Sequence, residues 1–156
     1  MQTKIRKATE KDIPEIILLE KKLNSFERKI NGVSIYRKGF EKSEKRYLKK
    51  AIASKKGAAI VAELNGKIVG CLTAKPDTWR EKFAFNKWVL IDDLFVEKKF
   101  RKKKIATKML KEAERLLGSG INGFELFVLK GNNRAIALYK KLGYKETVSV
   151  MLKRKP

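Results

Sequence analysis

Histidine is absent from this chain of 156 residues, and cysteine occurs once. Without an imidazole, the chain cannot contain a Ser-His-Asp or Cys-His catalytic group, a histidine-ligated metal or a histidine general base. The single cysteine, Cys71, cannot form an intramolecular disulfide or a four-cysteine metal site, and we expect no metal. It lies in the apolar run 68–72, which favours a small core residue. Proton transfer must therefore use groups other than imidazole.

Acidic residues are also scarce, because 17 Asp and Glu stand against 39 Lys and Arg, a formal net charge of +22. A surface of this charge attracts polyanions, so nucleic acid, ribosomes, acidic partners and phosphorylated cofactors are all candidates. No apolar run approaches the ~18 residues of a membrane span, and the charged first residues do not fit a signal peptide. We expect one cytoplasmic domain over residues 1–156, without membrane contact.

The spacing of apolar residues predicts a mixed sheet with helices on both faces. Asn65-Gly66 separates two apolar runs and is the strongest short signal for a β-hairpin. A first helical face runs from Ile13 to Leu23, and from Asn24 to Gly39 the pattern is broken by Asn31-Gly32. The full set of predicted elements is strands at 3–9, 58–64, 67–74, 88–96, 123–129 and 144–153, and helices starting near Ile13, Phe40, Ile105 and Asn133.

Residues 75–87 contain Pro76-Asp77 and are interpreted as a loop between two strands. Three aromatic residues of this loop, Trp79, Phe83 and Phe85, either line a substrate site or cap the core. The sequence leaves both possibilities open.

Two turns, one rich in glycine and one basic, are candidate phosphate sites. Gly118, Gly120 and Gly123 spell G-x-G-x-x-G, but a helix enters this turn and a strand leaves it, which is the wrong direction for a dinucleotide site. The turn 97–104 has the correct direction, because a strand enters it and a helix opens near Ile105. Free N–H groups, the helix dipole and a run of cations favour phosphate binding there, although a solvated basic loop or a nucleic-acid contact is the alternative.

Two stretches carry a resemblance to a known family. After the strand ending at Val96, the run Arg101-Lys102-Lys103-Lys104-Ile105-Ala106 is similar to the motif R/Q-x-x-G-x-G/A, and Asn133, Tyr139 and Gly143-Tyr144 are similar to a second block. In order and spacing, these resemble the GNAT superfamily of acetyl-coenzyme A-dependent N-acetyltransferases. Lys104 replaces the first motif glycine. We expect ordinary φ and ψ there, at the helix entrance, with an ammonium group beside the phosphate.

The resemblance implies acetyl-CoA as co-substrate. The backbone of 94–96 would pair with the pantetheine arm, and the N–H groups of 102–107 would hold the pyrophosphate. Tyr139 would protonate the departing thiolate, unless its ring is only packed in the core. The implied cofactor-binding residues are Leu94, Phe95, Val96, Arg101, Lys102, Lys103, Lys104, Ile105, Ala106, Thr107 and Asn133.

Asp92 and Asp93 interrupt an otherwise apolar strand. Because successive strand residues face opposite sides, we expect only one of them to face a given cleft. The stretch 90–96 resembles polyamine acetyltransferases of this family. We favour Asp92 as a water-mediated base, the alternative being that both carboxylates pair with surplus Lys and Arg.

The resemblance implies an α/β fold of the GNAT type. This is a single domain with a mixed, mostly antiparallel sheet of about six or seven strands and about four helices, in which splayed parallel strands 90–96 and 123–129 form the cofactor cleft. It implies direct acetyl transfer to a primary amine, with a small amine or polyamine preferred. The alternatives are a protein or peptide acetyltransferase acting on Lys or an N-terminus, and a non-catalytic, basic nucleic-acid-binding module. A homodimer is possible.

Overall fold

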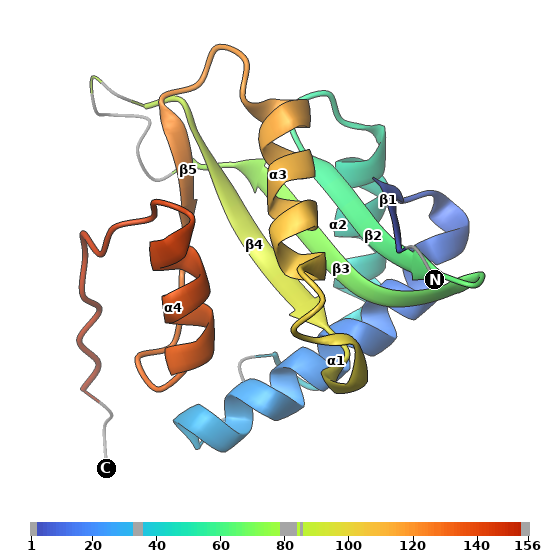
Figure 1. Ribbon diagram of the computed structural model, residues 1–156, viewed down its shortest axis with the longest axis horizontal. Coiled ribbons are helices and arrows are strands. Elements are labelled where there is room, and N and C mark those ends of the chain that lie inside the picture. Colours follow the sequence, from blue (N-terminus) through green and yellow to red (C-terminus); the bar gives the residue numbers. More distant parts are fainter. Residues whose placement is uncertain (1–2, 33–35, 79–83, 85, 154–156) are drawn as a thin grey trace.

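The computed structural model describes residues 3–32, 36–78, 84 and 86–153 (Figure 1). In this part of the chain, helices and strands follow one another much as the sequence predicts. The elements are β1 (Lys4–Lys7), η1 (Glu10–Asp12), α1 (Ile13–Asn31), α2 (Glu41–Ala53), β2 (Ala58–Leu64), β3 (Lys67–Pro76), β4 (Trp88–Val96), η2 (Lys98–Phe100), α3 (Ile105–Leu117), β5 (Gly123–Leu126) and α4 (Asn133–Lys141).

One mixed sheet has the strand order β1-β2-β3-β4-β5 in the described residues. The first three pairings are antiparallel, whereas β4 and β5 are parallel. The hairpin at Asn65-Gly66 is confirmed, and both residues have positive φ (51° and 75°), as a tight two-residue turn requires.

The parallel pair separates partway along its length. Pairing between β4 and β5 runs from Trp88 and Gly123 to Ile91 and Leu126, and β4 then continues to Val96 without β5 (Figure 1). The predicted parallel pair 90–96 and 123–129 is thus present in part, since β5 ends at Leu126 and β4 extends beyond it. The separation leaves the β5-facing edge of residues 94–96 free of strand pairing.

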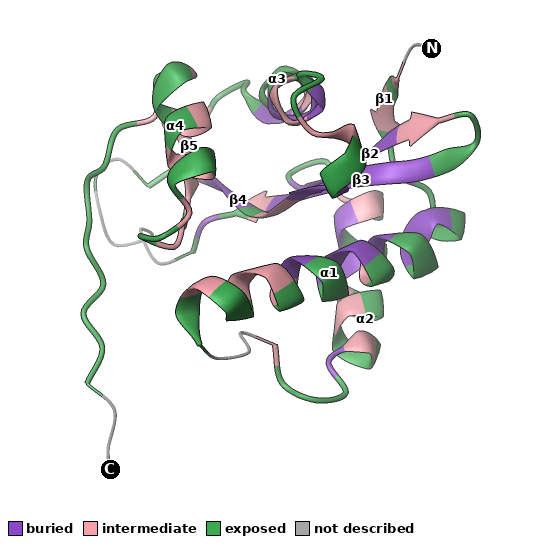
Figure 2. Cartoon of the chain, turned by 60° about the horizontal axis from the view of Figure 1, so that its bottom comes forward, coloured by how far each residue is buried: buried purple, intermediate pink, exposed green. Residues whose placement is uncertain are grey.

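Helices cover both faces of the sheet, as predicted. Figure 2 shows α1 and α2 on one face and α3 on the other, with the buried strands between them. The apolar stripe of α3, which includes Ile105, Met109 and Leu117, packs on β2, β3 and β4. On the other face, Ile16 and Leu48 pack with Cys71, which is fully buried as expected. α4 lies beside the separated end of the sheet (Figure 1).

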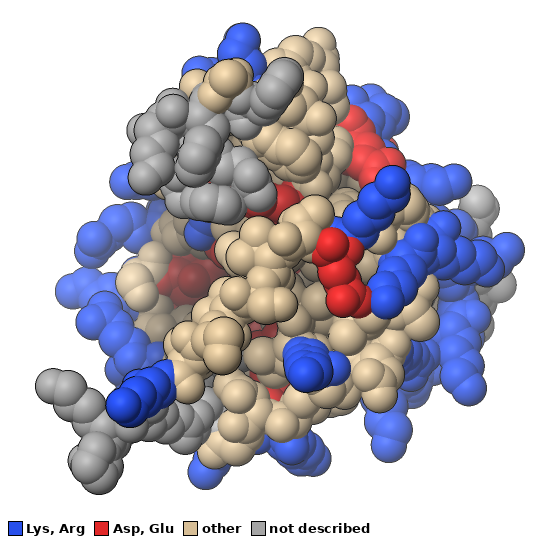
Figure 3. Space-filling view, turned by 90° about the vertical axis from the view of Figure 1, so that its left-hand side faces the viewer, with Lys and Arg blue, Asp and Glu red and all other residues tan. Residues whose placement is uncertain are grey.

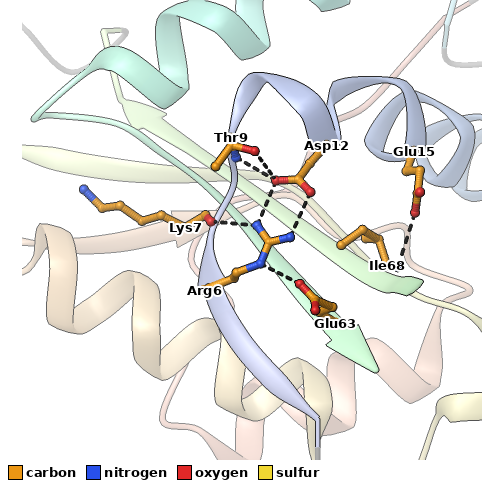
Figure 4. A network of polar contacts seen from close by, with 7 residues as sticks. All are labelled: Arg6, Lys7, Thr9, Asp12, Glu15, Glu63 and Ile68. Carbon is orange, nitrogen blue, oxygen red and sulfur yellow. Dashed lines mark hydrogen bonds and ion pairs between the residues drawn. The ribbon is translucent and has the colours of Figure 1, made fainter. Parts of the chain in front are cut away.

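A network of polar contacts fixes the start of the fold (Figure 4). The Arg6 guanidinium donates to both Asp12 oxygens (2.8 and 2.9 Å) and to Glu63 (2.7 Å). Thr9 donates its backbone N–H to Asp12 at 2.7 Å, which completes a capping box. These bonds, led by the one to Arg6, lower the pKa of Asp12 to about 2. β1, β2 and the beginning of α1 are thereby tied together.

Two of the predicted strands, 144–153 and 123–129, differ from the structure. The expected strand 144–153 is an extended segment without strand pairing, and its Val148, Val150 and Leu152 are exposed, so the described sheet has five strands. Apolar alternation is present there, but a strand also needs a neighbouring edge with which to pair. The expected strand 123–129 ends at Leu126. The first helix continues past Leu23 to Asn31 and ends at the predicted break Asn31-Gly32, where Gly32 has a φ of 75°. Its buried face stops at Leu23, whereas its backbone bonds need no core beneath them.

Candidate active site

The turn between β4 and α3 presents unpaired backbone N–H groups. Lys108 is the first residue to donate along the helix, to the Lys104 carbonyl at 3.0 Å, and no side chain caps the helix start. For the N–H groups of 102–107, the described structure records no acceptor. Donors at a helix start, with the positive end of the dipole, form an anion site. This is the geometry that the sequence predicts for a pyrophosphate.

Lys104 does not have the ordinary conformation expected of it. Its φ and ψ are 59° and 15°, in the left-handed region, and Lys102 also has positive φ (64°). Each such residue costs about 1 kcal/mol when it is not glycine. The reason is the turn itself, since left-handed residues close to one another make consecutive N–H groups converge on one point. Lysine thus adopts the glycine geometry of the motif, and its side chain is exposed.

Arg101 is turned toward the protein interior. Its Nε donates to the Val96 carbonyl at 2.7 Å, and its guanidinium carbon lies 5.2 Å from the Phe26 ring centre and 5.3 Å from that of Phe95. Burial lowers its pKa, with a smaller contribution from Arg134 at the start of α4. Arg101 therefore connects α1 to the end of β4 and supports the turn, whereas Lys102, Lys103 and Lys104 face solvent.

The end of β4 has one paired and one open edge. Leu94, Phe95 and Val96 pair with β3, and their other edge has lost β5. Beside this strand end is an open cavity of about 630 Å³. Its lining residues are Lys22, Phe95, Glu97, Lys98 and Lys99. An elongated ligand could lie along the open edge and end at the basic turn.

The second motif places two candidate residues on α4. Asn132 is the helix cap, because its side-chain oxygen accepts from the Ala135 N–H at 3.3 Å, and the Asn133 side chain is exposed. Tyr139 is half-buried, with its ring centre 5.7 Å from that of Tyr144. Burial, and next the charge of Glu27, raise the pKa of Tyr139 to about 12. Its hydroxyl therefore remains protonated at neutral pH and can donate a proton or a hydrogen bond.

Both aspartates of β4 approach the side covered by α1 and α2, contrary to the expectation from simple alternation. The pairing register shifts here: Thr73 pairs with Asp93 and Ala74 with Ile91, so the backbone of Asp92 has no register partner on β3. Such a β-bulge breaks the alternation of side chains. Asp92 is partly exposed and pairs with Lys75 at 2.6 Å. One alternative from the sequence, pairing with surplus lysine, thus holds for this residue.

Asp93 is held by hydroxyl groups instead of by a cation. Its Oδ1 accepts from the Tyr36 hydroxyl at 2.5 Å, and its Oδ2 lies 3.5 Å from the Thr73 hydroxyl. Burial raises its pKa. Because Asp93 is buried and already bound by hydroxyl groups, it is less suited to take a proton from a substrate amine than the partly exposed Asp92.

Three glutamates around these aspartates were missed by the sequence reasoning. Burial is the first cause of each raised pKa: Glu20 reaches about 9, and Glu27 and Glu44 about 7. The charge of Asp93 adds to each of them. A signal was available for Glu20, which lies seven residues after Ile13 and three before Leu23, on the apolar face of α1. We call Glu20, Glu27, Glu44, Asp92 and Asp93 the acidic cluster.

Figure 3 shows how this charge is distributed. Some acidic atoms lie in hollows of this face and others lie at its surface beside Lys and Arg, and most Lys and Arg side chains form the margin of the face. The expected loop aromatics Trp79, Phe83 and Phe85 lie outside the described residues. Within the described chain, no helix is long and apolar enough to cross a membrane, and no group of three or more His, Cys, Asp and Glu could hold a metal ion.

Known proteins share this fold and sequence pattern. The model of the acetyltransferase (GNAT) family matches residues 27–144. A thialysine N-epsilon-acetyltransferase of Mus musculus is 29% identical over 151 residues, covering 90% of this chain and 83% of that protein. An aminoglycoside N-acetyltransferase, AAC(6')-Iy, solved with CoA, superposes with a TM-score of 0.77 at 17% identity, over 99% of this chain and 95% of its own. A protein of Clostridium acetobutylicum described as a predicted acetyltransferase, solved with acetyl-CoA, superposes with a TM-score of 0.75 at 23% identity, over 98% of this chain and 96% of its own.

Proposed function

Because this chain belongs to the GNAT family of acetyltransferases, and is thus an acyltransferase, we propose that it N-acetylates a small cationic amine with acetyl-CoA. The observation that carries the proposal is the set of free N–H groups in the turn 102–107, next to the open edge of β4. The names of its relatives, which include acetyltransferases of thialysine and of aminoglycosides, agree with an amine acceptor.

The residues at the turn fit the phosphates of the cofactor. Backbone donors of 102–107 bind the pyrophosphate, and the exposed ammonium groups of Lys102, Lys103 and Lys104 add charge around it. Arg101 acts indirectly, by holding the turn against α1. Asn133, exposed at the start of α4, is available for a further polar contact. When bound, acetyl-CoA supplies the activated acetyl group.

The acetyl carbonyl requires donors, and the acceptor amine requires a base. The open backbone edge of Leu94, Phe95 and Val96 aligns the pantetheine arm and polarises the carbonyl. Asp92, partly exposed beside Lys75, takes the amine proton through water. The protonated hydroxyl of Tyr139 returns a proton to the departing thiolate. Cys71 is fully buried and therefore cannot carry the acetyl group, which favours direct transfer from acetyl-CoA to the amine.

The acidic cluster supports a cationic acceptor. In a chain of net charge +22, five carboxyl groups gather behind the end of β4. The positive surface attracts the anionic cofactor, and the recessed acids attract an ammonium group. This arrangement favours a small amine over an acceptor on the surface of a protein or peptide.

Binding and turnover together test the proposal. Titration calorimetry should show heat on adding acetyl-CoA, and coenzyme A release should saturate with a panel of amines that includes a lysine peptide. Tyr139→Phe should lower kcat about 100-fold without loss of acetyl-CoA affinity, because only the proton donor is removed. Tyr144→Phe is the matched control and should keep kcat within about twofold. Absence of acetyl-CoA binding, or transfer to the peptide alone, would contradict the proposal.

A further inference from the structure

Glu20 is a carboxyl group for which the fold provides no partner. It lies in the middle of α1 with an exposed fraction of 0%, and neither of its oxygens has a hydrogen-bond partner among the described residues. Burying a carboxyl group without a partner is costly, and an apolar side chain of similar size would pack there without that cost. Packing therefore does not account for Glu20.

The surroundings of Glu20 are acidic on two further elements. Glu44 approaches from α2, and one of its oxygens is likewise buried without a partner. Asp92 and Asp93 approach from β4, and each helps to raise the pKa of Glu20. The charged and titratable groups recorded around Glu20 and its acidic neighbours are Glu27, Tyr36, Glu44, Tyr47, Cys71, Lys75, Asp92 and Asp93.

Positive charge around this group is insufficient. Lys75 pairs with Asp92 at 2.6 Å and lies 5.2 Å from the centre of the Tyr47 ring. Asp93 is bound by the Tyr36 hydroxyl, which brings no charge. One ammonium group therefore serves several carboxyl groups, and Glu20 and Glu44 have none of their own in the described structure.

An open cavity adjoins Tyr36, whose hydroxyl contacts Asp93 of the same group. Tyr36 lines an open cavity of about 380 Å³ between α1 and the segment before α2, and its hydroxyl binds Asp93. Asn24 and Phe40 also line this cavity, and the Phe40 ring stacks on Tyr36 with centres 4.6 Å apart. Tyr36 thus lies between an opening in the surface and the acidic cluster.

We infer that Glu20 and Glu44 form a subsite for a second ammonium group, so that the acceptor is a diamine or polyamine. The inference rests on the proposed acetyl transfer. The reacting amine lies near Asp92, and the distal ammonium lies between α1 and α2, where it gives the unpartnered oxygens a charged donor. Without the ligand, the fully buried Glu20 carboxyl, which lacks a donor, keeps its proton at pH 8, and a bound ammonium group displaces that proton.

Kinetics with a matched pair of amines tests the subsite. Putrescine and butylamine have the same chain length but differ in the second ammonium. We expect the wild-type protein to prefer putrescine in kcat/KM, and Glu20→Gln to reduce the putrescine-to-butylamine ratio about tenfold, mainly through KM. Glu112→Gln is the control, because Glu112 pairs with Arg115 on α3, across the sheet. It should leave the ratio unchanged.

Calorimetry gives a second readout that a purely structural role would not change. Putrescine binding at pH 8, compared in phosphate and Tris buffers, should release protons, and Glu20→Gln should release fewer. If Glu20→Gln does not fold, the putrescine-to-butylamine ratio of Glu44→Gln is measured instead, and an unchanged ratio overturns the inference. An unchanged amine ratio and unchanged proton release in a folded variant overturn the inference while acetyl transfer stands. Absence of acetyl-CoA binding overturns the proposed function itself.

Discussion

Two buried carboxyl groups, one just before α1 and one within it, have opposite surroundings. Asp12, just before α1, receives the Arg6 guanidinium and the Thr9 N–H, and its pKa falls to about 2 (Figure 4). Glu20, about two turns further on, has no donor in the described structure, and its pKa rises to about 9. Both are buried, with exposed fractions of 8% and 0%.

The two carboxyl groups have opposite effects on the stability of the fold. The Arg6 network stabilises the fold, since it joins β1, β2 and α1 by bonds that the charged form of Asp12 requires. Glu20 and Glu44 of the acidic cluster lower stability, since they have buried oxygens without a donor in the described structure. Places where a chain departs from good packing are often functional sites, and here the departure is adjacent to the proposed acceptor position.

The largest effect is expected from removing Arg6, the cation that binds Asp12 and Glu63. Arg6→Met should lower the free energy of unfolding by about 3 kcal/mol at pH 7, because Asp12 and Glu63 then lose their cation. The pKa of Asp12 is depressed in the folded state, so its contribution is present above pH 4 and is lost as the pH falls toward 2. Urea unfolding at pH 7 and pH 3 measures both. The control is Lys4→Met, an exposed position of the same strand; equal losses in the two variants would contradict the role of the network.

An intermediate effect of opposite sign is expected at the unsatisfied carboxyl group. The folded pKa of Glu20 is raised above its unfolded value, so the stability of the wild-type protein should fall as the pH rises from about 4.5 to about 9. Glu20→Gln removes this pH dependence. At pH 9 its free energy of unfolding should exceed that of the wild-type protein by about 1–2 kcal/mol, and at pH 4.5 the two should be almost equal. Unfolding curves across this pH range, with Glu112→Gln as the control, measure it. A constant difference between Glu20→Gln and the wild-type protein at all pH values would argue against a titrating group at this position.

The smallest effect is expected from relieving backbone strain at Lys104. Lys104 occupies the left-handed region, so Lys104→Gly should stabilise the protein by about 0.5–1 kcal/mol. Lys103, which is not among the residues with positive φ, gives the matched control, and Lys103→Gly should not stabilise. Thermal unfolding compares the two. A loss of stability in Lys104→Gly would show that its side chain makes a contact more valuable than the relief of strain.

The sequence predicts the order of helices and strands well, because apolar spacing reports burial directly. The hairpin at Asn65-Gly66 and the α3 stripe follow from local rules alone. The expected strand at 144–153 fails for the opposite reason, since its alternation is local but its pairing would depend on a distant edge.

For the site, the sequence identifies the turn and both β4 aspartates but not their geometry. The bulge at Asp92 depends on the register with β3, and the φ of Lys104 depends on the path from strand to helix. Glu20 could have been found, since a glutamate at a core position of an amphipathic helix is itself a signal. Its neighbours on α2 and β4 could not, because only the folded chain brings them together.

The divergence of β4 and β5 affects the rate at which a ligand can enter. Their pairing ends at Ile91 and Leu126, so in the described residues the slot along the rest of this edge of β4 has no interstrand bonds to β5. No ladder of interstrand bonds has to unzip before an incoming molecule inserts, and little ordering entropy remains to be lost there. Association at this slot should therefore be governed by diffusion and by the attraction of the basic turn, with no slow conformational step before it.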